Sequence, residues 1–165
     1  MSSADINPQL CYQCGKCVST CPMNRREFKY NDRKLIQFFN LGFKEEAMND
    51  PYLWCCTTCY TCQEGCPQKV GVVDGILHIR TLAVKEGIML DPHRAVAQNV
   101  YKYGMAVPID EKNMKKRESV GLDGMAPNTQ KFDKSLDEVK KLIELSGFDK
   151  LIEKRPKKKG EAANE

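Results

Sequence analysis

The chain has 165 residues, with 26 Lys or Arg against 22 Asp or Glu, which gives a formal net charge of +4. Apolar residues make up 41% of it, and nine of these are cysteines. If eight cysteines bind metal, little more than a third of the chain is left to build a core, which is thin for a free-standing globular domain. A metal centre that cross-links the chain, or a partner surface, would have to supply the rest.

Most of the net positive charge, +3 of +4, lies in the tail KRPKKKGEAANE, residues 154–165, so the body of the chain is almost neutral. That balance excludes a general nucleic-acid binder, and we expect the tail to be solvated and disordered. The N-terminus MSSADINPQL lacks a secretory signal, and no run of about 18 apolar residues predicts a membrane span. We therefore expect a cytoplasmic chain whose reduced thiols bind metal instead of forming disulfides.

A cysteine motif occurs twice with the pattern C-x2-C-x2-C-x3-C-P, and its second copy lies 45 residues after the first. The members are Cys11, Cys14, Cys17, Cys21 and Pro22, then Cys56, Cys59, Cys62, Cys66 and Pro67. This spacing is typical of [4Fe–4S] ligands. Zinc, the alternative, favours paired C-x-x-C sites separated by a longer loop.

In such motifs the first three cysteines bind one cluster, and the fourth binds the other cluster in two-cluster ferredoxins. The sequence therefore predicts two clusters with crossed ligands. The first would be held by Cys11, Cys14, Cys17 and Cys66, and the second by Cys56, Cys59, Cys62 and Cys21. Pro22 and Pro67 predict that a helix begins after each motif and points its positive N-terminus at an anionic cluster.

The remaining segments predict a mainly α protein with few or no strands. Apolar residues at helical spacing follow each copy of the motif. They are Leu35, Ile36, Phe38 and Phe39 after the first copy, and they predict a helix over residues 70–85 after the second. Asp91 and Pro92 predict the N-cap and first turn of a helix that Gly104 ends. Residues 104–133 predict an arm with one short helix at 111–118. A Ser135–Glu138 capping box predicts a last helix that Gly147 ends.

The other candidate residues favour structural interpretations. Cys55 lies outside both registers and is expected to be a buried thiol, with a cluster neighbour or a swapped ligand as alternatives. We expect His78 to be a packing residue and His93 a surface residue. The basic run Arg25, Arg26, Lys29, Arg33 and Lys34 predicts a solvated face or a docking site for an acidic partner. No nucleophile with its base and no phosphate-binding loop is present.

Four segments together resemble the C subunit of heterodisulfide reductase, and the resemblance extends from Leu10 to Ile152. They are LCYQCGKCVSTCP, LWCCTTCYTCQEGCP, YGMAVPI at 103–109 and GFDKLI at 147–152. The resemblance implies an α-helical ferredoxin fold, like the cluster-bearing half of the succinate dehydrogenase iron–sulfur subunit. It also implies an electron relay from a flavin-bearing A subunit to a catalytic B subunit, which reduces the mixed disulfide of coenzyme M and coenzyme B during methanogenesis. The larger complex would include a hydrogenase or a formate dehydrogenase.

We therefore predict a two-cluster ferredoxin domain at 1–103, a partner-binding arm and helix at 104–153, and a basic tail at 154–165. The chain lacks the Cys-Cys-Gly signatures of the catalytic subunit, so we expect no catalytic residues on it. We expect the B subunit to bury apolar side chains of the arm and of the C-terminal tip, namely Met105, Val107, Ile109, Leu151 and Ile152. The alternative is an iron–sulfur subunit of another oxidoreductase, such as a fumarate- or glycolate-oxidising complex or a sulfur-oxidising relative.

Overall fold

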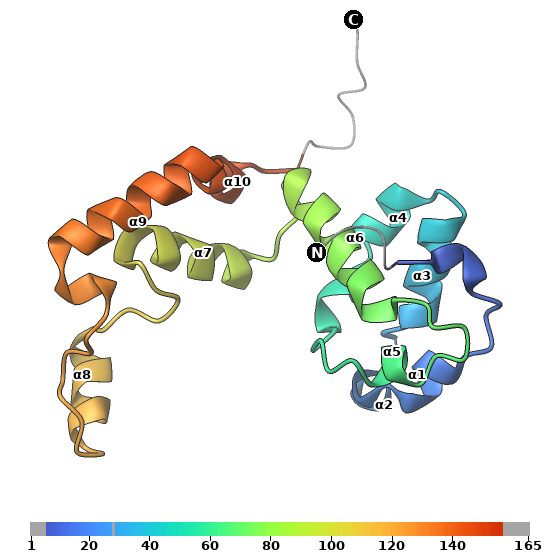
Figure 1. The fold of residues 1–165 in the computed structure, drawn as a ribbon, viewed down its shortest axis with the longest axis horizontal. Helices are drawn as coiled ribbons and strands as arrows, with labels where there is room; N and C mark the ends of the chain where they lie inside the picture. The colour runs from blue at the N-terminus through green and yellow to red at the C-terminus, as the bar shows by residue number, and fades with distance from the viewer. Residues whose placement is uncertain (1–5, 28, 157–165) are drawn as a thin grey trace, which may run out of the picture. The chain divides into compact units, whose positions relative to one another are not determined.

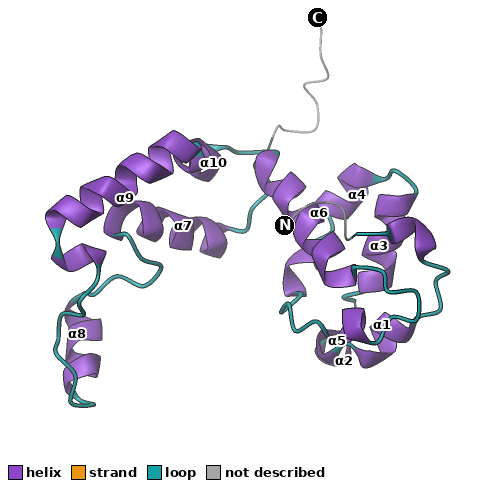
Figure 2. Cartoon of the chain, viewed as in Figure 1, coloured by secondary structure: helices purple, strands orange, loops and turns teal. Residues whose placement is uncertain are grey.

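The computed structural model describes residues 6–27 and 29–156, and the elements in these ranges are helices without any strand (Figure 2). Two compact units divide the chain, Met1–Ile88 and Met89–Glu165. The boundary between the units lies after Ile88, earlier in the chain than the boundary expected after residue 103. The helix over residues 91–103 belongs to the second unit because it packs against helices near the C-terminus. Within the described ranges, no helix combines the length and the apolar character that a membrane span requires.

The first unit consists of short helices around one longer helix, α6 (Figure 1). In chain order they are η2 (Pro8–Leu10), α1 (Lys16–Thr20), α2 (Pro22–Arg26), α3 (Asp32–Asn40), α4 (Lys44–Met48), η3 (Leu53–Cys55), α5 (Thr61–Glu64) and α6 (Val72–Lys85). Helix α6 packs against α3 and α4, and α1 packs against α5. The mainly α prediction is confirmed.

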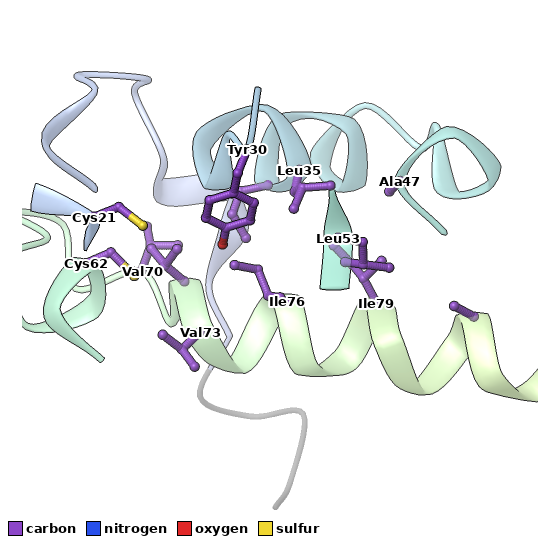
Figure 3. Close-up of a cluster of buried hydrophobic side chains, with 13 residues drawn as sticks. Cys21, Tyr30, Leu35, Ala47, Leu53, Cys62, Val70, Val73, Ile76 and Ile79 are labelled. Carbon is purple, nitrogen blue, oxygen red and sulfur yellow. The ribbon is translucent and has the colours of Figure 1, made fainter. Parts of the chain in front are cut away.

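The core of the first unit lies between α3 and α6. Leu35 and Ile36 from α3 belong to one buried cluster with Ile76 and Ile79 from α6, and all four are at most 1% exposed. Figure 3 shows Leu35, Ile76 and Ile79 in this cluster. Gly75 permits this close approach, because a Cβ atom added there would lie 2.8 Å from Ile36 Cδ1. The two helices that follow the motif copies therefore pack against each other.

One prediction about the helix starts is confirmed and one is wrong. Pro22 begins α2, with Cys21 as its N-cap residue. Pro67 does not begin a helix, and α6 starts only at Val72. The chain turns around Cys66 instead: the Lys69 N–H donates to the Cys66 carbonyl (3.1 Å), and the Val70 N–H donates to the Cys66 sulfur (3.4 Å).

The second unit contains α7 (Asp91–Tyr103), α8 (Glu111–Glu118), η4 (Thr129–Lys131), α9 (Asp133–Ser146) and α10 (Phe148–Glu153). Gly104 and Gly147 end α7 and α9 in the left-handed conformation, and α8 has the predicted bounds. Two predicted starts are wrong: α7 has Leu90 as its N-cap residue and α9 has Phe132, so neither Asp91 nor the Ser135–Glu138 box caps a helix. Each helix begins earlier because its N-cap residue is extended and already accepts the first helical hydrogen bond.

Few apolar side chains are buried in the second unit. Ala97 and Ile152 are the apolar residues in its described part that are less than 9% exposed, and the Arg94 guanidinium lies between α7 and α10, donating to the Ile152 carbonyl. Ile152, which we expected a partner subunit to bury, is therefore already buried within its own unit. Other apolar side chains of the unit are exposed, including Val96, Val107, Val120, Leu122, Phe132, Leu142 and Leu145.

Residues 104–133 fold back on themselves. The Gln130 amide accepts from the Ile109 N–H (2.8 Å) and donates to the Ile109 carbonyl (3.0 Å), which joins the two ends of the segment. Gly104 is also close to the Thr129 side chain. The segment therefore has internal structure, while Val107 remains exposed.

Candidate metal centre

The two cysteine loops share one backbone conformation. Gln13 and Thr58, 45 residues apart, have φ values of 64° and 55°, and Gly15 and Tyr60, also 45 apart, have values of 81° and 62°. A positive φ is unusual for a bulky residue such as Tyr60 and marks a conformation that the surroundings impose. A short helix, α1 or α5, follows each loop at the same offset. The repeat in the sequence is therefore a repeat in the structure.

Left-handed residues in a tight loop turn neighbouring backbone N–H groups toward one side of it. Such a concave arrangement favours an anion. A cluster held by four thiolates is anionic, so the backbone of both loops suits it as well as the cysteines do.

A single cavity brings together the four cysteines that the crossed assignment gives to the first cluster. Cys11, Cys14 and Cys17 line it from the first loop, and Cys66 lines it from the second copy of the motif. The Tyr12 hydroxyl lies beside Cys14 and near Cys66; its hydrogen bond with the Cys14 thiol is the main cause that raises the pKa of Tyr12.

Three of the four cysteines assigned to the second cluster are close neighbours. Burial raises the pKa of Cys62, and several neighbours raise it further: the Asp32 carboxyl and the thiols of Cys56, Cys21 and Cys17. Figure 3 shows Cys21 beside Cys62, with the ring of Tyr30 near them. The fourth member, Cys59, is exposed on the same loop, where the Thr61 hydroxyl lowers its pKa.

A buried carboxyl, that of Asp32, lies between the two cysteine sets. Asp32 is the first residue of α3 and is 1% exposed. Its Oδ1 accepts from the Arg33 N–H (2.9 Å), while Oδ2 is buried without a well-aligned donor. Burial raises the pKa of Asp32, and hydrogen bonding with Cys17 and Cys62 opposes that change. One thiol from each set therefore lies against the same carboxyl.

Burial also keeps these thiols protonated when no metal is bound. It is the main cause that raises the pKa of Cys17 to about 12, and the Asp32 carboxyl adds to it. Burial raises the pKa of Cys21 in the same way. Metal binds the thiolate, so binding at these positions must release protons.

No three Cys, His, Asp or Glu side chains in the described ranges converge as the ligands of a single ion would. A cubane cluster is bound differently, because each of its four irons takes its own thiolate and the sulfur atoms surround the cube. The first cavity, with four thiols around it, suits that arrangement.

One arginine holds each cysteine loop, and the sequence interpretation missed both roles. Arg33 from α3 donates through Nη1 to the Gln13 carbonyl (3.2 Å), and Arg80 from α6 donates to the carbonyls of Leu53 (3.0 Å) and Cys56 (2.8 Å). The Arg80 guanidinium also stacks over Trp54, 5.5 Å from the ring centroid. An arginine on the helix after each motif is the signal that could have identified them.

The basic run is therefore only partly a solvated face. Arg25, Arg26 and Lys29 are exposed, but Arg33 lines the first cavity and Lys34 pairs with the largely buried Asp50 at 2.9 Å. The prediction is wrong for Arg33, because α3 turns this side chain toward the first cavity, whereas Lys34 remains exposed while it pairs with Asp50.

The other structural interpretations agree with the described contacts. Cys55 is half-buried against the core, and burial raises its pKa. His78 packs edge-to-face on Phe39 with ring centroids 5.6 Å apart, while His93 is exposed.

Comparison with protein families matches residues 8–70 to the 4Fe-4S dicluster domain. The matched range contains all eight cysteines of the two motif copies. The family thus supports [4Fe–4S] clusters on this part of the chain and a helical, ferredoxin-like fold.

Three similar proteins come from methanogens. The chain is 46% identical to the C subunit of the H(2):CoB-CoM heterodisulfide,ferredoxin reductase of Methanothermobacter thermautotrophicus, over 87% of this chain and 77% of that protein. It is 44% identical to the iron-sulfur C subunit of the CoB--CoM heterodisulfide reductase of Methanopyrus kandleri, over 89% and 76%. It is 39% identical to the C subunit of the Ferredoxin:CoB-CoM heterodisulfide reductase of Methanosarcina mazei, over 92% of each chain.

Proposed function

The chain belongs to the family of heterodisulfide reductase C subunits, and from this premise we propose that it relays single electrons through two [4Fe–4S] clusters between the other subunits of that complex. An iron–sulfur electron-transfer role within a multi-subunit oxidoreductase follows from the family itself. The finer proposal is that electrons pass from a flavin-bearing A subunit to a B subunit that reduces the coenzyme M–coenzyme B heterodisulfide. Names of relatives that mention H2, formate or ferredoxin extend the proposal to a hydrogenase or formate dehydrogenase as the more distant donor.

The crossed assembly of the first cavity is the observation that supports this proposal most directly. Cys66 belongs to the second motif copy, yet it lines one cavity with Cys11, Cys14 and Cys17. We assign these four to the first cluster and Cys56, Cys59, Cys62 and Cys21 to the second. When bound, each cluster would accept and release one electron without making or breaking a bond to substrate.

The chain's own residues hold the two sites close together and keep water from the space between them. Cys17 of one set and Cys62 of the other lie against the same buried Asp32 carboxyl. Electron tunnelling falls off steeply with distance, so this proximity favours transfer between the sites. Cys14 and Cys59 are exposed, one in each set, and give each site an edge that a partner could approach. We propose that the chain itself has no substrate site and works in the reducing cytoplasm.

The second unit suits a role in assembly. Its described part buries little apolar surface and exposes Leu142 (66%) and Leu145 (84%) on α9. Contiguous exposed apolar side chains mark interaction sites. We propose that the arm and helices over residues 104–153 dock on a larger subunit, with the catalytic one as the expected partner. A permanent interface of this kind buries about 2,000 Å² or more.

Anaerobic isolation of the native complex tests the proposal. We expect about eight iron and eight sulfide per chain, broad visible absorption that bleaches on reduction, and co-purification with a flavoprotein and a protein bearing Cys-Cys-Gly signatures. Co-purification with a different flavin-dependent oxidoreductase would favour the alternative complex. Stoichiometric zinc without visible absorption would exclude the electron-transfer role.

A further inference from the structure

Arg33 places a fixed positive charge in the cavity of the first cysteine set. Its side chain is half-buried and lines the cavity together with Cys11, Cys14, Cys17 and Cys66. A Cβ atom added at Gly15 would lie 3.6 Å from Arg33 Nη1, so the guanidinium lies directly over the loop.

The charge of Arg33 is held in place by a carbonyl and is not neutralised by a carboxylate. Nη1 donates to the Gln13 carbonyl, and the ion pairs between described residues do not include Arg33. The carboxyl of the adjacent Asp32 faces Cys17 and Cys62. It accepts a hydrogen bond from the backbone N–H of Arg33, and the ion pairs between described residues do not join it to the Arg33 guanidinium. Lys16 also lines the cavity, but its side chain is exposed and water screens its charge.

Reduction adds an electron to a cluster that is already anionic. A nearby cation stabilises the reduced form more than the oxidised form, because the Coulomb attraction grows with the added charge. Hydrogen bonds and charges around a cluster are established determinants of its potential. Arginine keeps its charge at any relevant pH, so this effect does not depend on titration.

We infer that Arg33 is a positioning residue of the first cluster: it fixes the Gln13 loop and raises the reduction potential of that cluster without a comparable effect on the second. This inference depends on the crossed two-cluster assignment proposed above. Arg80 is the corresponding arginine of the second cysteine set, because it donates to the carbonyls of Leu53 and Cys56.

The test is a redox titration of the anaerobically loaded full chain, followed by electron paramagnetic resonance. Cys14→Ser, which changes one ligand of the first set, identifies the signal of the first cluster. In Arg33→Gln we expect the potential of the first cluster to fall so that its reduced-to-oxidised ratio at a fixed applied potential drops about tenfold, or about 59 mV. The second cluster should change by much less, and Arg80→Gln should show the opposite selectivity.

Two further variants separate charge from structure. Arg33→Lys keeps the charge and should shift the potential of the first cluster less than Arg33→Gln does. Arg26→Gln removes an exposed arginine of the same basic run and should leave both potentials unchanged. If Arg33→Gln fails to load the first cluster, Arg33→Lys should load it at a potential close to that of the wild type.

The inference is overturned if Arg33→Gln leaves the first potential unchanged, shifts both clusters equally, or matches Arg26→Gln. A loaded Arg33→Lys chain with the full tenfold change also overturns it, because the charge is still present. A wild-type chain without two one-electron signals would instead contradict the proposed function, so the two failures are distinguishable.

Discussion

Cys21 of the first motif copy lies beside Cys62 of the second in the core of the first unit, and each is 6% exposed (Figure 3). Each of the two has thiol neighbours in the other copy of the motif. Cys21 lies near Cys56, and Cys62 lies near both Cys21 and Cys17. The last cysteine of one copy therefore belongs to the surroundings of the other copy's loop. The two copies of the motif therefore pack together in one core, as the proposed crossed ligand assignment requires.

Replacement of Cys66 tests the crossed ligand assignment. We expect Cys66→Ser to lose or damage the first cluster while the second remains, which would lower the iron content by about half. Iron analysis and the Mössbauer spectrum of the purified chain measure this. Loss of the second cluster alone would contradict the assignment, because Cys66 would then serve its own copy.

Cys55→Ser is the matched control for that experiment. Cys55 adjoins a predicted ligand but lines neither set, and its side chain is half-buried against the core. We expect both clusters to remain, because exchange of one sulfur for oxygen outside the ligand sets leaves only a small packing change. Loss of a cluster in this variant would identify Cys55 as a ligand.

Removal of the Tyr30 hydroxyl should lower the potential of the second cluster. Tyr30 is 1% exposed; burial raises its pKa, and the Cys56 thiol near its hydroxyl raises it further, so the hydroxyl stays protonated and donates toward that sulfur. In Tyr30→Phe the lost hydrogen bond is worth about 1 kcal/mol, or roughly a fivefold change in the reduced-to-oxidised ratio. A redox titration measures it.

Tyr12→Phe provides the comparison. The Tyr12 side chain is exposed and its hydroxyl bonds Cys14 of the first set, so solvent can replace the lost donor. We expect a smaller shift, and on the first cluster only. Equal shifts of both clusters in Tyr30→Phe would show that the hydroxyl does not act through Cys56.

The close approach of α3 and α6 makes Gly75 sensitive to substitution. In Gly75→Ala the new methyl group would lie 2.8 Å from Ile36 Cδ1, and overpacking of this kind costs about 1–3 kcal/mol. Better helix propensity offsets about 1 kcal/mol of that. We expect a lower free energy of unfolding, measured by anaerobic denaturation of the loaded chain.

The double variant Gly75→Ala/Ile36→Val isolates the contact. Valine lacks the Cδ1 atom, so the added methyl group gains room, and the double variant should be more stable than the sum of the two single changes predicts. Simple additivity would show that the two side chains do not meet.

Charges on the exposed face of α9 should prevent assembly. Leu142→Glu and Leu145→Glu replace side chains that are 66% and 84% exposed with a carboxylate. The isolated chain should therefore fold and load clusters normally. A buried interface would tolerate neither, and we expect the native complex to fail to form. Size-exclusion chromatography of the co-expressed subunits measures this.

Asp137→Lys is the control on the same helix, since Asp137 is an exposed polar residue. It should assemble like the wild type. Normal assembly of the two leucine variants would show that this face of α9 remains in solvent in the complex.

The sequence by itself determined the chemistry of the site. Cysteine spacing is set by the geometry of a short loop around a cube, so eight ligand candidates and the 45-residue repeat could be predicted without coordinates. Helix ends at Gly104 and Gly147 could be predicted as well, because glycine adopts the left-handed conformation without a steric penalty. The helix expected over residues 70–85 corresponds to α6 (Val72–Lys85), but the turn that separates Pro67 from it could not be predicted, because this turn depends on contacts with Cys66.

Only the tertiary structure decided the surroundings of the two cysteine sets. Asp32 and Arg33 are adjacent in an ordinary polar stretch, yet one carboxyl is buried between the sets and one guanidinium lines the first cavity. Local patterns do not specify this, because the direction of each side chain depends on how α3 packs against α6 and the cysteine loops. Local spacing predicts which cysteines are candidate ligands, whereas the burial and charge around them arise from contacts between residues far apart in the chain.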